Sequence, residues 1–238
     1  MLSLQNQQLK NSKKQVSVEK IKSPPSYPCQ YNKGYLIMKR VIDIIGSFAG
    51  LIVLSPILLF LSILIKIESP GPVFFRQERV GKDGRLFTFL KFRTMKTATD
   101  KEEDDYIKKI ISMKSELDHK SIVFKMKIDP RLTRVGRFLR KTSLDELPQF
   151  INVLKGDMSL VGPRPPIPYE LEIYDEWHKE RLKCKPGVTG MWQVEGTTKS
   201  TLNDMVRLDI KYMKECSLWL DLKILLKTPF VVLTGQGE

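Results

Sequence analysis

The chain has 238 residues and a formal net charge of +13, from 40 basic and 27 acidic side chains. This length accommodates one domain of ordinary size with its own core, or a smaller domain joined to a membrane element. The charge favours anionic partners, namely nucleic acid, an anionic membrane surface or phosphorylated substrates. Three widely separated cysteines without metal-ligand spacing argue against a disulfide scaffold and fit a reducing, cytosolic setting.

The amino-terminal stretch, residues 1–33, is rich in Gln, Asn, Ser and Lys and shows no apolar periodicity. We interpret it as a mostly disordered basic tail. The first apolar run begins near residue 35 and lacks a small-residue cleavage site, so we expect no secretory signal.

An almost unbroken apolar run lies between Lys39 and Lys66. It is long enough to cross a bilayer and more apolar all round than a core helix usually is. Ser55 and Pro56 lie in its middle, where proline removes a backbone donor. Basic residues flank both ends and give no inside–outside asymmetry. The residues alone therefore leave two alternatives open, a kinked spanning helix and a re-entrant helical hairpin broken at Ser55-Pro56.

Two β-rich runs, residues 73–80 and 85–93, enclose a glycine-containing loop and predict a β-hairpin. In the second run Lys91 and Arg93 fall on one face of the strand. The pattern leaves open whether this face is solvated or lines a site. The charged segment 95–127 that follows is expected at the surface and partly helical.

Residues 129–140 predict a basic amphipathic helix with an arginine at every third position. Arg140 ends this helix and is followed closely by Asp145 and Glu146. One interpretation makes the acid pair a helix start, with Ser143 as N-cap and Glu146 completing a capping box. Acidic residues in a first turn also suit the helix dipole.

A second interpretation gives the acid pair a chemical role. Arg140 precedes it and Arg164 follows it, held between Pro163 and Pro165. A carboxylate beside cations stays ionised and nucleophilic, and the cations can hold an anionic phosphate against it. An arginine between prolines loses little freedom when its planar fork binds phosphate. This arrangement indicates phosphoryl transfer.

The carboxy-terminal third is expected to be largely helical. We predict a surface helix over residues 166–182, a turn-rich loop over 185–194, and a helix over 203–214. Residues 217–233 are strongly apolar and suit an interfacial helix in the headgroup plane, with a core helix as the alternative. Trp192 and Gln193 in the loop are candidates for nucleobase contacts, although Trp192 also suits a core position.

The string LDELPQFINVLKGDMSLVGPRP, residues 144–165, closely resembles the core signature of the bacterial sugar transferase family. These are the monotopic polyprenyl-phosphate hexose-1-phosphate transferases, or phosphoglycosyl transferases. QERVG at 77–81, KFRTM at 91–95 and PGVTGMWQV at 186–194 extend the resemblance. It covers residues 38–232 and matches the small, catalytic-domain form.

The resemblance implies a mainly helical α+β fold with one compact cytosolic domain. A re-entrant membrane hairpin over residues 34–67, a β-hairpin and amphipathic interfacial helices would surround a catalytic domain over residues 68–238. The expected location is the bacterial inner membrane, in contact with anionic phospholipid, with the catalytic domain on the cytoplasmic face. Whether the chain forms a homodimer is left open.

The resemblance also implies an activity, the transfer of sugar 1-phosphate from a UDP-sugar to undecaprenyl phosphate with release of UMP. This would be the first membrane step of exopolysaccharide, capsule, O-antigen or glycan assembly. Asp145 would be the nucleophile, and Glu146 would position Mg²⁺ with it or handle a proton. The substrate phosphates would contact four basic residues: Lys91, Arg93, Arg140 and Arg164.

Three rival interpretations follow from the same sequence. A non-catalytic membrane-surface scaffold explains the apolar run and the charge, but not an acid pair beside a proline-flanked arginine. Nucleic-acid binding is disfavoured because the basic residues are not organised around a recognition helix. A conventional glycosyl transferase would release UDP instead of UMP.

Overall fold

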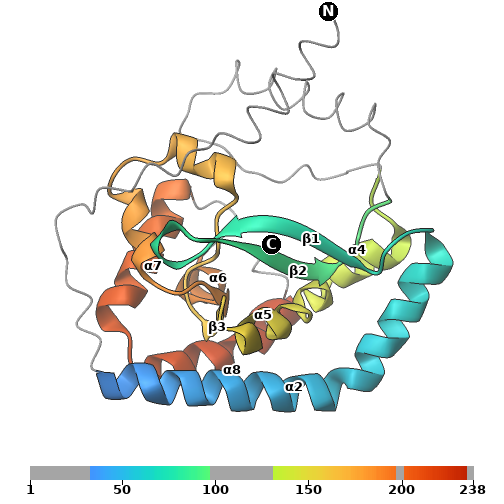
Figure 1. The fold of residues 1–238 in the computed structure, drawn as a ribbon, viewed down its shortest axis with the longest axis horizontal. Helices are drawn as coiled ribbons and strands as arrows, with labels where there is room; N and C mark the ends of the chain where they lie inside the picture. Colours follow the sequence, from blue (N-terminus) through green and yellow to red (C-terminus); the bar gives the residue numbers. More distant parts are fainter. Residues whose placement is uncertain (1–32, 97–130, 197–200, 235–238) are drawn as a thin grey trace, which may run out of the picture.

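The computed structural model describes residues 33–96, 131–196 and 201–234. Nearly all of the expected tail at 1–33 and of the charged segment at 95–127 lies outside these ranges. The described chain is mainly helical, with two small two-stranded sheets (Figure 1). Its elements in order are α2 (Lys33–Glu68), β1 (Phe74–Val80), η1 (Lys82–Gly84), β2 (Leu86–Phe92), α4 (Arg134–Lys141), η2 (Leu144–Glu146), α5 (Gln149–Lys155), β3 (Ser159–Val161), η3 (Pro168–Ile173), η4 (His178–Lys183), β4 (Gly187–Thr189), α6 (Met191–Glu195), α7 (Leu202–Glu215) and α8 (Leu218–Thr234).

Helix α2 is the one described helix long and apolar enough to cross a membrane by length and composition. A polar stripe on α2 joins it to the rest of the fold. Arg40 donates from its two terminal nitrogens to the last carbonyls of α5, Val153 and Leu154, at 2.6 and 2.9 Å. Asp43 is buried and accepts from the Ser159 hydroxyl at 3.0 Å. We call the parts of α2 before and after Pro56 its first and second arms. Because Arg40 and Asp43 bond to the folded unit, the first arm lies against protein on that side.

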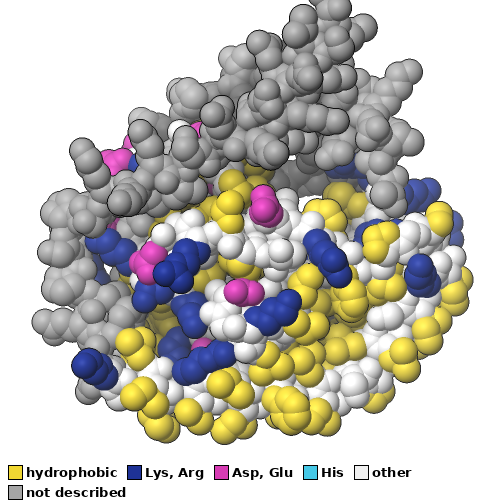
Figure 2. All heavy atoms as spheres, viewed as in Figure 1, with side chains coloured by type: hydrophobic (Ala, Val, Ile, Leu, Met, Phe, Trp, Pro, Cys, Tyr) yellow, Lys and Arg dark blue, Asp and Glu magenta, His cyan; other side chains and the backbone are white. Residues whose placement is uncertain are grey.

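The remaining surface of α2 is apolar and exposed. Figure 2 shows hydrophobic side chains along the rim that α2 forms in Figure 1. Helix α8 is joined near its start to α2, because Asp221 accepts from Tyr35 and Lys39, and it adds further exposed apolar side chains. An exposed apolar area of this extent marks an interaction surface. The largest contributors on α2 are Ile37, Ile45, Phe48, Ile52, Val53, Leu59, Phe60, Ile63 and Ile67, and those on α8 are Trp219, Leu222, Leu226, Phe230 and Leu233.

Helix α2 continues through Pro56 and bends, as Figure 1 shows, so the helix is kinked at this point and not broken as in the hairpin alternative. Proline leaves the carbonyl four residues earlier, that of Ile52, without its helical donor. The Ser55 hydroxyl donates to this carbonyl at 2.7 Å. The side chain thus replaces the lost backbone bond, which keeps the helix intact at an exposed apolar position.

The predicted β-hairpin is confirmed. Strands β1 and β2 pair antiparallel, with Phe75 opposite Lys91 and Arg79 opposite Phe87. Side chains directly opposite each other lie on the same face, so Lys91 shares a face with Phe75. Arg79 is four residues after Phe75 in the same strand and therefore lies on that face too. Asn152 of α5 accepts from the Leu90 amide at 3.1 Å and thereby fixes α5 to the outer edge of β2.

Helix α4 packs against the chain just after β2. A Cβ atom on Gly136 would lie 1.9 Å from the Thr94 carbonyl oxygen, so only glycine permits this close approach. Thr133 caps α4 by accepting from the Gly136 amide at 2.9 Å. Glu68, at the end of α2, accepts from the amides of Arg134 at 2.6 Å and of the next residue at 2.9 Å. The end of α2 is therefore bonded to the helix that leads into the acid pair.

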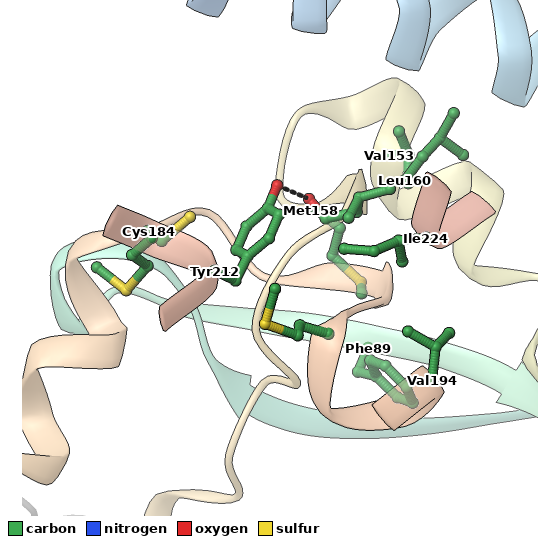
Figure 3. Close-up of a cluster of buried hydrophobic side chains, with 11 residues drawn as sticks. Phe89, Val153, Met158, Leu160, Cys184, Val194, Tyr212 and Ile224 are labelled. Carbon is green, nitrogen blue, oxygen red and sulfur yellow. Dashed lines mark hydrogen bonds between the residues drawn. The ribbon is translucent and has the colours of Figure 1, made fainter. Parts of the chain in front are cut away.

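The core lies between the hairpin, α5, α7 and α8 (Figure 3). Buried apolar side chains from all four elements meet there, including Phe89, Val153, Tyr212 and Ile224. The Tyr212 hydroxyl oxygen lies 3.3 Å from the Val161 carbonyl oxygen. This contact joins α7 to the small parallel sheet of β3 and β4.

Two sequence predictions for the carboxy-terminal third need correction. The expected surface helix over 166–182 is instead a pair of short 3-10 turns, η3 and η4. The expected loop over 185–194 contains β4, which pairs parallel with β3, and the short helix α6. The predicted helix over 203–214 is confirmed as α7, which begins with a capping box of Thr201 and Asp204.

Candidate active site

The acid pair occupies a short 3-10 turn, η2, and does not start a helix. Ser143 has a left-handed backbone (φ 51°) and makes no side-chain cap, so the alternative of a capping box at Ser143 and Glu146 is wrong. Helix α5 begins later, at Gln149. The backbone of Ser143 turns the chain sharply after α4 and places Asp145 inward, where it is 7% exposed. Strained left-handed residues of this kind often occur at functional sites.

Two cations from neighbouring elements act on Asp145. Lys91 comes from β2 and Arg140 from the end of α4, and each favours the charged carboxylate. Arg140 donates from Nε to the Thr94 hydroxyl at 3.0 Å, which fixes its guanidinium beside the end of β2. Arg140 therefore points inward.

Burial and the neighbouring Glu146 carboxylate nevertheless have the largest effects on the pKa of Asp145. They raise the pKa of Asp145 to about 6, with desolvation as the largest cause and Glu146 second. The cations favour the ionised carboxylate, as the sequence predicted, but burial and Glu146 outweigh them. Lys91 is also destabilised in its charged form, because burial lowers its pKa while Asp145 opposes the shift. The site therefore holds charges that an incoming ligand can stabilise.

Arg79 belongs to the site, although the sequence analysis did not select it. Burial, followed by repulsion from Arg164, lowers the pKa of Arg79 to about 10, and Glu146 partly opposes this shift. Its guanidinium lies 5.1 Å from the centre of the Phe89 ring. The same two-residue alternation that selected Lys91 identifies Arg79 once the register of the hairpin is known.

Arg164 lies at the exposed tip of a proline-rich loop. The loop is fixed to the hairpin, because Arg79 Nη1 donates to the Pro165 carbonyl at 3.0 Å and the Val80 amide donates to the Pro166 carbonyl at 2.9 Å. The side chain of Arg164 faces solvent, and its charge acts on Arg79. Such an arginine is free to receive an anion.

Arg93 has a structural role, in contrast to the sequence prediction. Its Nη1 donates to the Pro70 carbonyl at 2.6 Å and its Nη2 to the Ser69 carbonyl at 2.7 Å. The side chain is buried beneath the turn that leaves α2. Because both terminal nitrogens are engaged, we withdraw Arg93 from the phosphate contacts.

Trp192 and Gln193 are half-buried on α6, which packs against α7 and α8. The Gln193 side chain donates to the Val188 carbonyl at 3.5 Å, while its Oε1 is buried without a partner among the described residues. None of the described contacts joins either residue to Asp145. Their assignment to a nucleobase stays a prediction.

An acid pair with surrounding cations, beside a long apolar helix, defines a site suited to phosphoryl chemistry at a lipid surface. Comparison with known proteins agrees with this class. The bacterial sugar transferase family matches residues 34–235. The chain belongs to this family.

Several relatives with curated names match over most of the chain. The galactosyl transferase CpsE of Streptococcus agalactiae is 47% identical over 208 residues, 87% of this chain and 44% of the relative. The exopolysaccharide production protein ExoY of Sinorhizobium fredii is 39% identical over 202 residues, 85% of this chain and 88% of the relative. The UDP-glucose:undecaprenyl-phosphate glucose-1-phosphate transferase of Escherichia coli is 41% identical over 202 residues, 82% of this chain and 40% of the relative. The chain thus spans less than half of two of these relatives and most of the third.

Proposed function

We propose that this protein is a phosphoglycosyl transferase. It moves sugar 1-phosphate from a UDP-sugar to undecaprenyl phosphate and releases UMP, an early step in building an exopolysaccharide or another glycan. The observation that carries the proposal is the buried Asp145, whose charge is destabilised by burial and by Glu146 and favoured by Lys91 and Arg140. The name of the Escherichia coli relative supplies the classes of donor and acceptor, and that of the Sinorhizobium relative supplies the exopolysaccharide.

The first step is nucleophilic displacement at phosphorus. The Asp145 carboxylate attacks the sugar-bearing phosphorus, a bond from its oxygen to phosphorus forms, and the bond to the bridging oxygen breaks. UMP leaves with the electron pair of that bond. Lys91, Arg140 and Arg164 stabilise the charge on the phosphate oxygens during this step.

The second step regenerates the enzyme. A phosphate oxygen of the lipid attacks the phosphorus of the aspartyl phosphosugar, and the Asp145 carboxylate leaves. The product is polyprenyl diphosphate sugar, and no external oxidant or reductant is needed. A carboxylate with a pKa of about 6 is ionised enough to attack at neutral pH and leaves more readily than a stronger base.

The acid pair fits a magnesium ion held jointly with substrate. No group of three or more His, Cys, Asp or Glu side chains gathers as a metal site among the described residues. Mg²⁺ is typically bound by one or two carboxylates together with substrate phosphates. Glu146 raises the pKa of Asp145, and a dication between them would relieve this repulsion. When bound to Asp145 and Glu146, Mg²⁺ would neutralise the diphosphate of the donor.

We further propose a re-entrant α2 at the cytoplasmic face of the inner membrane. Both arms of α2 contact the same folded unit. Arg40 bonds the first arm to α5, whereas Leu61 and Ile65 of the second arm pack against Leu139 of α4. A spanning helix would place its two ends on opposite faces of the bilayer, out of reach of one aqueous domain. A re-entrant α2 also brings the acid pair to the level of the lipid phosphate.

The test is UMP release by purified protein in detergent with undecaprenyl phosphate, Mg²⁺ and a panel of UDP-sugars. We expect UMP from at least one donor and none from the Asp145→Asn variant. UDP as product would indicate a conventional glycosyl transferase. A folded protein that releases UMP from no donor, yet functions in cells with Asp145→Asn, would support the scaffold alternative.

A further inference from the structure

An ion pair, Arg181 of η4 with Asp209 of α7, is almost completely enclosed by protein. The side chains are each 1% exposed, with Arg181 Nη2 and Asp209 Oδ2 2.5 Å apart. The Tyr174 hydroxyl accepts from Arg181 Nη1 at 2.8 Å. A buried ion pair contributes little net stability compared with well-packed apolar residues, so its presence calls for another explanation.

Arg181 also holds the backbone of the phosphate-binding candidate. Its Nη2 donates to the carbonyl of Arg164 at 2.9 Å. The proline-rich loop around Arg164 has few backbone amides, because Pro163, Pro165 and Pro166 carry no N–H group. The loop can therefore be fixed mainly through its carbonyls.

The three carbonyls from Arg164 to Pro166 are each engaged. Arg181 holds the first, Arg79 holds the second and the Val80 amide holds the third. The hairpin thus supplies two donors, and the Arg181–Asp209 pair supplies the remaining one from the opposite side. Of the three, the bond from Arg181 is the one made to the residue that would grip phosphate.

Electrostatics link Asp209 to the same loop. Burial raises the pKa of Asp209 to about 6, although the charges of Arg181 and Arg164 both act in the opposite direction. Asp209 is therefore a counter-ion beneath two arginines. Without it, Arg181 would carry an uncompensated buried charge beside Arg164, and the carbonyl contact would lose its orientation.

We propose that Arg181 and Asp209 are positioning residues that orient Arg164 toward the diphosphate of the nucleotide sugar. This inference rests on the proposed function for the nature of the ligand. The pair acts through Arg164 and makes no contact with substrate. Its loss therefore weakens diphosphate binding only while the Arg164 side chain is present.

A double-mutant cycle tests this coupling. The variants are Arg164→Ala, Asp209→Asn and their combination, with Asn203→Ala as a matched control. Asn203 joins the same two elements through His178 Nε2 at 2.7 Å, and none of the contacts among the described residues joins it to the loop. The readouts are the Kd for UDP in the presence of Mg²⁺, the kcat and KM for the active UDP-sugar, and the thermal unfolding midpoint.

We expect Asp209→Asn to raise the Kd for UDP and the KM about tenfold with a smaller change in kcat. In the Arg164→Ala background the same substitution leaves Kd and KM unchanged. Asn203→Ala leaves both unchanged in either background. Equal effects of Asp209→Asn in both backgrounds would overturn the proposal and leave a structural role.

A second variant guards against misfolding. If Asp209→Asn does not fold, Tyr174→Phe removes one hydrogen bond from Arg181 without leaving a charge unpaired, and the cycle is repeated with a smaller expected shift. Asp209→Glu keeps the charge and is expected to restore much of the affinity. The UDP cycle needs no turnover. Failure of the proposed function, seen as no UMP from any donor, is therefore distinguishable from failure of this inference.

Discussion

Two buried carboxylates, Asp221 and Asp145, illustrate two uses of charge in one fold. Asp221 joins α8 to the rest of the chain and receives three partners. Lys39 lies 2.8 Å from its Oδ2, the Tyr35 hydroxyl donates to the same oxygen at 3.0 Å, and the Tyr212 hydroxyl donates to Oδ1 at 2.6 Å. Lys39 and Tyr35 lie on α2 and Tyr212 lies on α7, so Asp221 joins three helices.

Asp145 is equally hidden from solvent but less well compensated. Among the described residues, its bonded partner is its own backbone amide, and Lys91 and Arg140 act on it through space. Its raised pKa records this lack of compensation. The comparison teaches that a buried acid with direct partners holds the fold together, whereas a buried acid without them is available for chemistry.

The substitution Asp145→Asn separates these two uses most clearly. We expect UMP release to fall by about four orders of magnitude, because the nucleophile is removed. The folded state should become more stable by on the order of 2 kcal/mol at pH 7, since a destabilised charge is lost. Initial rates of UMP release and denaturant unfolding measure the two effects. A destabilised variant would contradict the comparison.

The matching substitution Asp221→Asn should have the opposite effect on stability. It leaves Lys39 without its counter-ion, and we expect a loss of about 3 kcal/mol. The protein that remains folded should keep most of its kcat, because none of the described contacts of Asp221 involves Asp145 or the cations around it. Unfolding curves and specific activity of the folded fraction are the measurements. Unchanged stability would show that the three partners of Asp221 contribute little.

Two neighbouring cations sharpen the comparison further. Lys91→Ala should lower kcat/KM about a hundredfold with little loss of stability, because its charge is poorly compensated. Arg93→Ala should instead lower stability by about 2 kcal/mol, since two buried carbonyls lose their donors. Parallel assays of activity and unfolding distinguish them. If Arg93→Ala lowered only activity, the structural assignment would fail.

The pH dependence gives the smallest expected effect. With the pKa of Asp145 near 6, kcat/KM should fall tenfold per pH unit below that value. The change of folding stability with pH has the opposite sign to that caused by an ordinary ion-paired carboxylate. Because the folded-state pKa lies above the unfolded value, the contribution of Asp145 to stability is present at low pH and is lost as pH rises through 6. Comparing unfolding of the wild type and Asp145→Asn at pH 5 and pH 7 isolates this contribution.

Local patterns predicted much of the fold. Period-two alternation located the hairpin, and the helix predicted over 203–214 is α7, which begins one residue earlier. A basic last turn followed by glycine is a local helix stop, and α5 ends in this way at Lys155 and Gly156, with φ 93° at Gly156. These features depend on neighbours in sequence, so the sequence contains the necessary information.

Features that depend on distant partners were predicted less well. Alternation placed Arg93 beside Lys91, but the side chain lies just beyond β2 and bonds to the turn after α2. Arg79 required the register of the hairpin. The Ser143 pattern matched a capping box locally, whereas the tertiary structure holds that residue in a left-handed turn. The Arg181–Asp209 pair joins two elements with no local signal of contact.

The central claim is that Asp145 is the nucleophile, and trapping its covalent adduct tests this most directly. Purified protein is given the active UDP-sugar and Mg²⁺ without lipid acceptor, quenched, and analysed by intact mass and peptide mapping. We predict a burst of about one UMP per enzyme and a sugar-phosphate adduct on Asp145. Release of UMP only when lipid is present, with no adduct, or an adduct on Glu146 in place of Asp145, would contradict the account.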